Sequence, residues 1–177
     1  LKDAYKSLDE ALVHGGIANN VKVNLVRIES DNLKNYEIKT KLKNVSGLLI
    51  PGGFGKRGTE GKISAIKFAR ENKIPFLGIC FGMQMAIIEF ARNKLKIKKA
   101  GSTELEGKCY PVIGLINEWD KDGKIIKGTD KNLGGTMRLG LYEAKLRNNS
   151  AINRIYKSSS IKERHRHRYE VNNKLKS

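Results

Sequence analysis

The stretch Gly78-Ile79-Cys80-Phe81-Gly82 decides the fold prediction for this chain. It follows the apolar residues 74–77 and precedes a helical pattern over 83–93. A cysteine with a glycine two residues away on each side, between a strand and a helix, is typical of a nucleophile elbow, a turn too tight for side chains at the flanking positions. The turn places the sulfur of Cys80 at a helix N-terminus, where unpaired N–H groups and the helix dipole favour the thiolate. The alternative is a buried cysteine that only fills space.

The pattern around this stretch predicts the fold of the N-terminal half. Helical spacing is expected over 3–14, 62–71 and 83–93, with Gly15-Gly16 ending the first helix, and strands over 21–26, 45–50 and 74–79. Residues 31–44 are polar and irregular. Strands that alternate with helices in this order predict an α/β fold with an open, mainly parallel sheet and right-handed crossovers.

The C-terminal half changes pattern. Shorter strands are expected over 110–116, 124–127, 136–139 and 164–171, with a helix over 151–156 between them. We therefore expect antiparallel additions to the sheet in this half.

Bulk composition narrows the class of protein. The chain of 177 residues is long enough for one domain, and no apolar run approaches a membrane span. Cys80 and Cys109 are too few for a disulfide framework, which predicts a reducing, cytoplasmic setting. The first residue is not Met, so we expect the chain to begin inside a longer protein.

The net charge of +17 could indicate a nucleic-acid partner. The lysines are spread along the whole chain, however, and only residues 162–168 form a local basic cluster. Nucleic acid is therefore an unlikely partner on this pattern, and steeply salt-dependent DNA affinity would indicate the opposite.

A second glycine-rich segment follows the strand predicted over 45–50. The loop Pro51-Gly52-Gly53-Phe54-Gly55 can expose consecutive backbone N–H groups to an anion, as an oxyanion hole requires. The second donor would be the N–H of Phe81, directly after the nucleophile. The alternatives are an ordinary turn and a phosphate-binding loop, although the spacing of the latter motif is absent.

The three histidines give weaker signals. His165 and His167 alternate on an extended segment and could share one face, but without nearby Cys or acidic ligands structural hydrogen bonding is favoured over a metal site. His14, at the end of the first predicted helix, is expected to cap or pack rather than act as a base.

Several of these segments resemble a known family. Residues 51–53, residues 78–84 (GICFGMQ) and Glu104 are similar to class I, triad-type glutamine amidotransferases. The resemblance narrows to the C-terminal amidotransferase domain of the CTP synthase family through residues 1–16, 54–62, 88–93, 134–140 and 164–173. It implies the class I amidotransferase fold, with a flavodoxin-like sheet, over residues 1–177.

The resemblance also implies site residues. Cys80 would attack the side-chain amide of L-glutamine and form a γ-glutamyl thioester, with backbone groups of Gly53 and Phe81 stabilising the oxyanion. The positions implied to hold glutamine are Gly53, Phe81, Gly82, Met83, Gln84, Glu104 and Arg168. A carboxylate suits the ammonium group of glutamine, and a guanidinium can bind its carboxylate. From sequence alone, Glu104 could equally be a surface acid, and Arg168 one more charge in a basic strand.

The family's cofactors and partners follow from the same resemblance. The amidotransferase domain has no cofactor or metal of its own. A synthetase domain of the same polypeptide uses UTP, ATP and Mg²⁺ to make CTP in pyrimidine biosynthesis, GTP activates the enzyme, and the assembly is a homotetramer without membrane partners. Phe54 and Arg57 fall in a loop that could respond to GTP; Phe54 could stack on a purine or act as an apolar lid.

The chain also departs from the family pattern. A His-x-Glu motif that serves as base and orienter is not found before Ser177, so we expect the domain to be incomplete at its C-terminus, to lack its N-terminal synthetase partner, and to have little glutaminase activity alone. The alternatives are a γ-glutamyl hydrolase-like cysteine hydrolase and a non-catalytic regulatory module.

Overall fold

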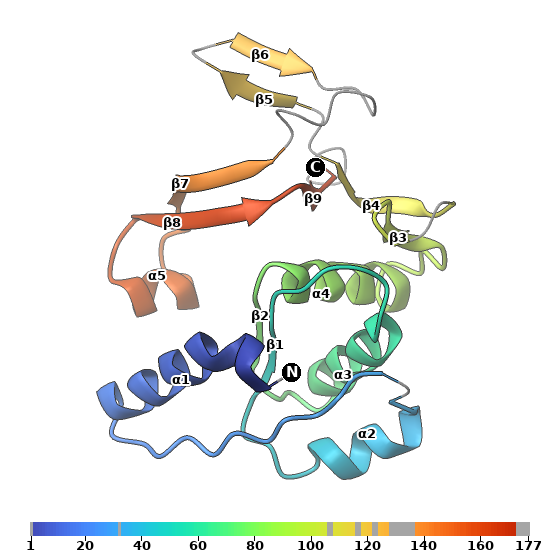
Figure 1. Cartoon of the computed structure of the whole chain (residues 1–177), viewed down its shortest axis with the longest axis vertical. Helices are drawn as coiled ribbons and strands as arrows, with labels where there is room; N and C mark the ends of the chain where they lie inside the picture. Colours follow the sequence, from blue (N-terminus) through green and yellow to red (C-terminus); the bar gives the residue numbers. More distant parts are fainter. Residues whose placement is uncertain are drawn as a thin grey trace.

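Strands and helices alternate over residues 48–102, as predicted for an α/β fold, and strands predominate after them (Figure 1). The computed structural model describes residues 2–31, 33–105, 108–115, 118–121, 124–127 and 137–172. The helices are η1 Lys2–Tyr5, α1 Lys6–Ala18, α2 Asn35–Leu42, α3 Thr59–Glu71, α4 Phe81–Asn93 and α5 Ala151–Tyr156. The strands are β1 Leu48–Ile50, β2 Phe76–Gly78, β3 Ala100–Ser102, β4 Tyr110–Leu115, β5 Glu118–Lys121, β6 Lys124–Lys127, β7 Arg138–Lys145, β8 Ser160–His167 and β9 Tyr169–Val171.

The strands pair in both directions, and the antiparallel pairs all lie in the C-terminal half. β1 and β2 pair in parallel, with Ile50 opposite Gly78, and β3 pairs in parallel with β4. The remaining pairs, β4–β9, β5–β6 and β7–β8, are antiparallel. The predicted parallel pairing and the antiparallel additions predicted for the C-terminal half are therefore both present, although in the described residues the strands form four separate sheets rather than one continuous sheet.

Helix α4 is the centre of the core. It contacts β1 and β2 on one side and the β3–β4–β9 sheet on the other, and it packs along α3 (Figure 1). Its apolar side chains Met85, Ile88 and Ala91 are buried. They pack with residues of the flanking strands and of α3 in one cluster, which fixes the direction of the helix that begins at the predicted elbow.

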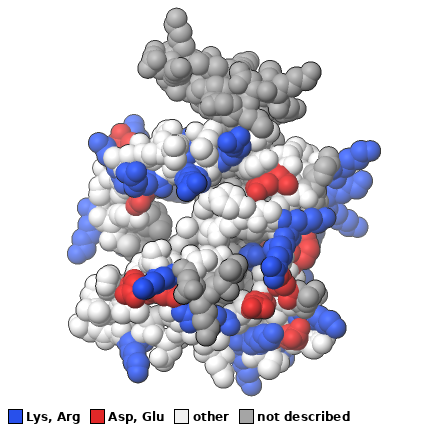
Figure 2. Space-filling view, in the orientation of Figure 1, with Lys and Arg blue, Asp and Glu red and all other residues white. Residues whose placement is uncertain are grey.

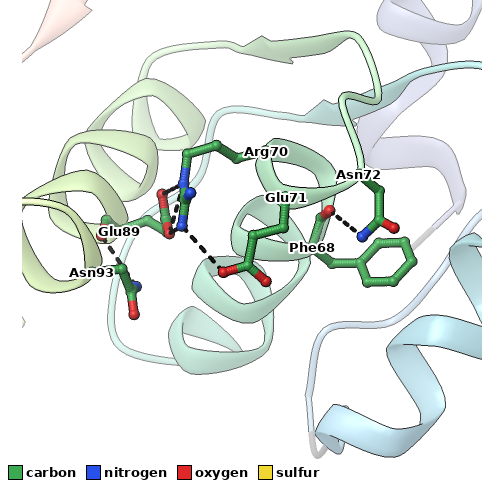
Figure 3. Close-up of polar contacts among 6 residues, drawn as sticks. All are labelled: Phe68, Arg70, Glu71, Asn72, Glu89 and Asn93. Carbon is green, nitrogen blue, oxygen red and sulfur yellow. Dashed lines mark hydrogen bonds and ion pairs between the residues drawn. The ribbon is translucent and has the colours of Figure 1, made fainter.

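An ion pair also joins α3 to α4 (Figure 3). The Nε of Arg70 donates to both carboxylate oxygens of Glu89, at 3.2 and 3.0 Å, and its Nη2 donates to Oε1 at 2.8 Å. The Glu89 side chain is 1% exposed, whereas Glu71, the second acid beside Arg70, is largely in solvent. Hydrogen bonding to Glu89 raises the pKa of the Arg70 guanidinium, so the arginine stays charged and compensates the buried carboxylate.

The first helix is longer than predicted. The Gly15-Gly16 pair lies inside α1, which ends at Ala18, so neither glycine is a C-cap and His14 lies within the helix, exposed, rather than at its end. A Cβ added at Gly16 would lie 2.7 Å from the carbonyl oxygen of Val21. Gly16 therefore allows the returning chain to cross close to the helix. The glycine is needed for this tertiary contact, although in the sequence it resembles a helix stop.

Two predictions between this helix and β1 were wrong. Residues 21–30 are extended but form no strand, because no other strand pairs with them among the residues described. Within the stretch 31–44, expected to be irregular, α2 forms instead. Ile38 and Leu42, four residues apart on α2, are buried against Ala65 of α3, so tertiary packing stabilises a helix with weak apolar patterning.

The C-terminal strands differ in their bounds. β7 runs on to Lys145, and the single strand predicted over 164–171 is two strands, β8 and β9, separated by a bend at Arg168. β3 and β5 were not predicted, whereas α5 has the predicted bounds. The predicted strand ends at 116 and 136, and parts of the segments 134–140 and 164–173, lie outside the described residues.

None of the helices in the described ranges combines the length and the apolar character needed to span a bilayer.

Candidate active site

The elbow predicted at Cys80 has the required geometry. Cys80 stands between β2 and α4 with φ 50° and ψ −102°, a backbone conformation that costs an L-residue free energy and that occurs typically at functional sites. A Cβ added at Gly78 would lie 2.6 Å from the carbonyl carbon of Gly82. One added at Gly82 would lie 2.1 Å from the carbonyl oxygen of Ile50. Both flanking positions therefore require glycine for the turn to form.

The ionisation of the thiol differs from the prediction. A hydrogen bond from the Phe81 backbone N–H lowers the pKa of Cys80, as expected for a sulfur at a helix N-terminus. Burial is the larger effect and raises that pKa, and the carboxylate of Glu104 raises it further. The net shift is upward, so the thiol is favoured over the thiolate and needs a base before it can act as a nucleophile.

Cys80 opens onto a cavity of about 280 Å³. Residues from five separate parts of the chain line it: Gly53, Phe54, Cys80, Gln84, Glu104, Met137, Arg166, His167, Arg168 and Tyr169. The structure thus brings together five of the residues predicted to hold glutamine or catalyse its hydrolysis, namely Gly53, Cys80, Gln84, Glu104 and Arg168. Phe54, predicted for the nucleotide response, joins them with its side chain 80% exposed.

The glycine loop lies directly beside the elbow. A Cβ added at Gly52 would be 3.8 Å from the Cβ of Cys80, and one added at Gly53 would be 3.9 Å from the Phe81 ring. The N–H of Gly55 donates to Oε1 of Glu104 at 3.3 Å, which ties the loop to the turn after β3. The loop and an acidic side chain thus face the sulfur from one wall of the cavity.

Gln84 and Arg168 also line the cavity. Gln84, in the first turn of α4, is 5% exposed, and its Nε2 donates to the carbonyl oxygen of Tyr169 at 3.1 Å. This bond connects the elbow helix to the bend at Arg168. Since the amide of Gln84 donates to Tyr169, its oxygen can accept from a ligand ammonium group.

Phe81, Gly82 and Met83, also predicted to hold glutamine, are not among the residues that line this cavity. The Phe81 side chain is buried in the core and Gly82 packs under Ile50, so only their backbone groups can face a ligand. Met83 lines a separate, apolar cavity of about 480 Å³ together with residues of β4 and β9. The side chain of Arg57 pairs with Asp31.

The histidine pair is hydrogen-bonded, as favoured from the sequence. Nδ1 of His165 and Nε2 of His167 are 2.9 Å apart, and Nδ1 of His167 is 3.2 Å from the carbonyl oxygen of Tyr169. Because that carbonyl can only accept, Nδ1 of His167 carries the proton and its Nε2 accepts from His165. Burial lowers the pKa of His167, more than the nearby carboxylate of Glu170 raises it, so the neutral ring is favoured.

The described residues contain no cluster of three or more His, Cys, Asp or Glu side chains suited to a metal ion.

Four lining residues were missed by the sequence reasoning: Met137, Arg166, His167 as a lining residue, and Tyr169. Three of them are neighbours of Arg168 in sequence. The bend at Arg168 allows consecutive residues to face one cavity, whereas the straight strand predicted here would have turned every second residue away. Met137 precedes β7, and only the pairing of β7 with β8 brings it to the site.

Charge on the surface is mixed. Figure 2 shows Lys and Arg side chains scattered over the visible face, with Asp and Glu side chains between them. Several of the arginines are paired with acids, including Arg27 with Asp9 and Arg92 with Glu60. The visible face therefore does not present a single basic stripe of the kind that follows a nucleic-acid backbone.

Comparison with known proteins places this site in context. The chain matches the family model for glutamine amidotransferase class-I over residues 1–177. It is 77% identical to a CTP synthase of Pelagibacter ubique over 172 residues, which cover 97% of this chain and 32% of that protein. A CTP synthase of Zymomonas mobilis is 58% identical over 175 residues, with the same coverage. The chain thus spans about a third of the length of the curated relatives it matches.

A solved structure is also similar. The glutaminase domain of Trypanosoma brucei CTPS, with bound acivicin, superposes with a TM-score of 0.83 at 34% sequence identity, covering 96% of this chain and 63% of that one.

Proposed function

Because this chain belongs to the class I glutamine amidotransferase family, we propose that it is the glutamine-hydrolysing domain of a CTP synthase. One observation carries the proposal: a strained cysteine elbow opens onto a cavity that also contains a glycine loop, an acid and an arginine. The high identity to CTP synthases supports the choice among amidotransferases, since it extends over nearly the whole chain.

The proposed reaction begins at Cys80. Its thiolate attacks the carboxamide carbon of glutamine, and the C–N bond breaks as the nitrogen takes up a proton and leaves as ammonia. Water then hydrolyses the γ-glutamyl thioester to glutamate and restores the thiol. The negative oxygen of each tetrahedral intermediate would accept hydrogen bonds from the backbone N–H groups of Gly53 and Phe81, and a donor of this kind contributes about 2.7–4 kcal/mol.

The charged residues of the cavity suit the two ends of glutamine. Glu104 and the side-chain oxygen of Gln84 can accept from the α-ammonium group, and the guanidinium of Arg168 can bind the α-carboxylate through two parallel hydrogen bonds. The size of the cavity, about 280 Å³, is compatible with one amino acid. Backbone groups of Gly82 and Met83 would complete the site.

The base that deprotonates Cys80 is not supplied by His167. His167 lines the cavity, but His165 occupies its Nε2 and the carbonyl of Tyr169 accepts from its Nδ1. We propose that the base is the histidine of the family's His-x-Glu motif, contributed by sequence beyond Ser177. The raised pKa of Cys80 makes this base necessary at neutral pH.

In the whole protein, ammonia released here would pass to a synthetase domain that binds UTP, ATP and Mg²⁺. The apolar, exposed ring of Phe54 at the mouth of the cavity supports a role for this loop in the response to GTP, and Arg57 would take part by exchanging Asp31 for a phosphate. A cytoplasmic homotetramer without membrane or nucleic-acid partners completes the proposal.

A chimaeric enzyme tests the proposal directly. This chain would replace the corresponding third of the Pelagibacter ubique relative, and CTP formation would be measured with glutamine and, separately, with ammonium chloride. We expect both nitrogen sources to support CTP formation, and Cys80→Ala to abolish only the reaction with glutamine. A chimaera that uses ammonia but never glutamine would contradict the proposal. Glutamine hydrolysis uncoupled from CTP formation would instead indicate a γ-glutamyl hydrolase.

A further inference from the structure

Arg168 lies at a joint between two sheets. β8 ends at His167 and pairs with β7, whereas β9 begins at Tyr169 and pairs with β4. Arg168 itself belongs to neither ladder and forms the bend between them. The direction of its side chain therefore depends on how the joint is held, since no backbone ladder fixes this residue.

One ion pair crosses the joint. Arg138, on β7 directly opposite His167, reaches past the bend to Glu170 on β9. Its Nε lies 2.5 Å from Oε1 of Glu170, and its Nη2 donates to Oε2 at 3.4 Å. The guanidinium carbon also lies 5.1 Å from the centre of the Tyr142 ring, four residues along β7. Arg138 thus belongs to the β7–β8 sheet and contacts Glu170 of the β3–β4–β9 sheet through two of its nitrogens, Nε and Nη2.

The same bend is tied from inside by the carbonyl of Tyr169. Gln84 donates to it from the elbow helix, and the ring of His167 donates to it from the end of β8. These two bonds fix the distance of the bend from the helix that begins after Cys80. The ion pair of Arg138 fixes the angle between the β7–β8 sheet and the β3–β4–β9 sheet. Arg138 does not line the cavity, so any influence on a ligand is transmitted through the bend.

We propose that Arg138 is a positioning residue: by bridging to Glu170, it holds the joint at the angle that directs Arg168 to the carboxylate of an amino-acid substrate. This inference rests on the proposed function, because it assumes that Arg168 binds the α-carboxylate. It concerns binding geometry and not the chemical step at Cys80. Loss of the bridge should weaken recognition of the amino-acid end of glutamine and leave the sulfur equally reactive.

Two alkylating reagents separate these effects in the chain of 177 residues. The chloromethyl ketone analogue of glutamine keeps the α-ammonium and α-carboxylate groups and depends on Arg168. Iodoacetamide has neither group and reports the reactivity of the sulfur alone. The rate of Cys80 modification would be followed for each reagent by mass spectrometry, and the ratio of the two rates is the selectivity.

For Arg138→Gln we expect selectivity to fall about tenfold at unchanged iodoacetamide rate, since a displaced binding group costs about this factor or more. Arg138→Lys keeps the charge but not the contact through two nitrogens, so its selectivity should lie between that of Arg138→Gln and that of the native chain. Glu170→Gln removes the same bridge with a side chain of equal size and should reproduce Arg138→Gln, which separates loss of the bridge from misfolding. Glu60→Gln removes an exposed ion pair with Arg92 away from the joint and should leave selectivity unchanged.

Full selectivity in both Arg138→Gln and Glu170→Gln would overturn the inference and leave the proposed function intact. A native chain that shows no preference for the glutamine analogue over iodoacetamide would overturn the proposed function, and the inference with it.

Discussion

The elbow at Cys80 and the bend at Arg168 face the same cavity, but they are held in different ways. The elbow is enclosed by backbone atoms: the positions of Gly78 and Gly82 leave no space for a Cβ, and Ile50 closes the turn from below. The bend is held by side-chain hydrogen bonds and one ion pair, which involve side chains of α4, β7, β8 and β9. One wall of the site is thus fixed by steric exclusion and the other by polar contacts.

This difference assigns separate tasks to the two walls. Steric exclusion fixes the position of the sulfur within a narrow range, because a backbone clash rises steeply with displacement. Polar contacts at a partly exposed surface each contribute less and can exchange with water. We therefore expect substitutions at the elbow to lower the stability of the fold. Substitutions at the bend should weaken ligand binding more than they lower stability.

The largest effect should come from closing the elbow with a methyl group. In Gly82→Ala the new Cβ would lie 2.1 Å from the carbonyl oxygen of Ile50, so the strand and the helix must separate. We expect the free energy of unfolding to fall by at least about 4 kcal/mol, measured by urea denaturation, at the upper end of overpacking effects. Gly114→Ala is the control, because a Cβ there meets nothing within 4 Å. A loss below 1 kcal/mol at Gly82 would show that the turn is not sterically closed.

A smaller loss should follow when the elbow helix loses its ionic support. Arg70→Met leaves the carboxylate of Glu89, 1% exposed, without its partner, and we expect about 3 kcal/mol of destabilisation in urea. The double variant Arg70→Met/Glu89→Met should recover much of this loss. Glu71→Gln removes only the exposed neighbour and should change stability by less than about 0.5 kcal/mol. Equal losses in Arg70→Met and Glu71→Gln would disprove the buried role of Glu89.

The ionisation of Cys80 tests whether burial or the helix terminus governs the sulfur. Burial raises the pKa of Cys80 above that of an ordinary cysteine thiol, so the reactive thiolate is the minor form at neutral pH. The iodoacetamide rate should rise about tenfold per pH unit between about pH 7 and 9, because the thiolate fraction of such a thiol follows pH in this way. In urea the midpoint should move down to that of an ordinary cysteine. A midpoint in the folded chain below the unfolded value would mean that the helix terminus outweighs burial.

The smallest effect on stability is expected at the bend. Gln84→Met keeps the volume of the buried side chain but removes the donor to the Tyr169 carbonyl, which retains its bond from His167. We expect a loss of about 1 kcal/mol in thermal or urea unfolding. Asn72→Ala, which removes an exposed side-chain bond to the Phe68 carbonyl (Figure 3), should cost less. A loss at Gln84 as large as that of Gly82→Ala would remove the distinction between the two walls.

The same distinction explains what the sequence could predict. The elbow is a local feature: glycine, cysteine and glycine at fixed spacing between a strand and a helix determine the turn, and the structure has it where predicted. Bringing Glu104 and Arg168 to the cavity of Cys80 was predictable only through the family resemblance, since they lie far from the elbow in sequence. The bend that splits the last strand depends on Gln84 of α4 and Arg138 of β7, and the periodicity of residues 164–171 contains no sign of these contacts.

The errors in the fold have a similar origin. Gly15-Gly16 resembles a helix stop, but Gly16 serves a close crossing of the chain at Val21. The weak pattern of α2 becomes a helix because Ile38 and Leu42 find a buried surface on α3. Residues 21–26 have the alternating pattern of a strand, but no strand pairs with them among the described residues. In each case the deciding contact is tertiary, whereas the pattern itself is local.

The buried thiol of Cys80 has a consequence for oxidative damage. Peroxides attack the thiolate form of cysteine, so a sulfur whose pKa is raised by burial should form sulfenic acid slowly. The sulfur of Cys80 would then rest in a form resistant to oxidants and become vulnerable only while a base holds it ionised. Protection of the resting sulfur and dependence on a base are, on this view, two results of the same burial.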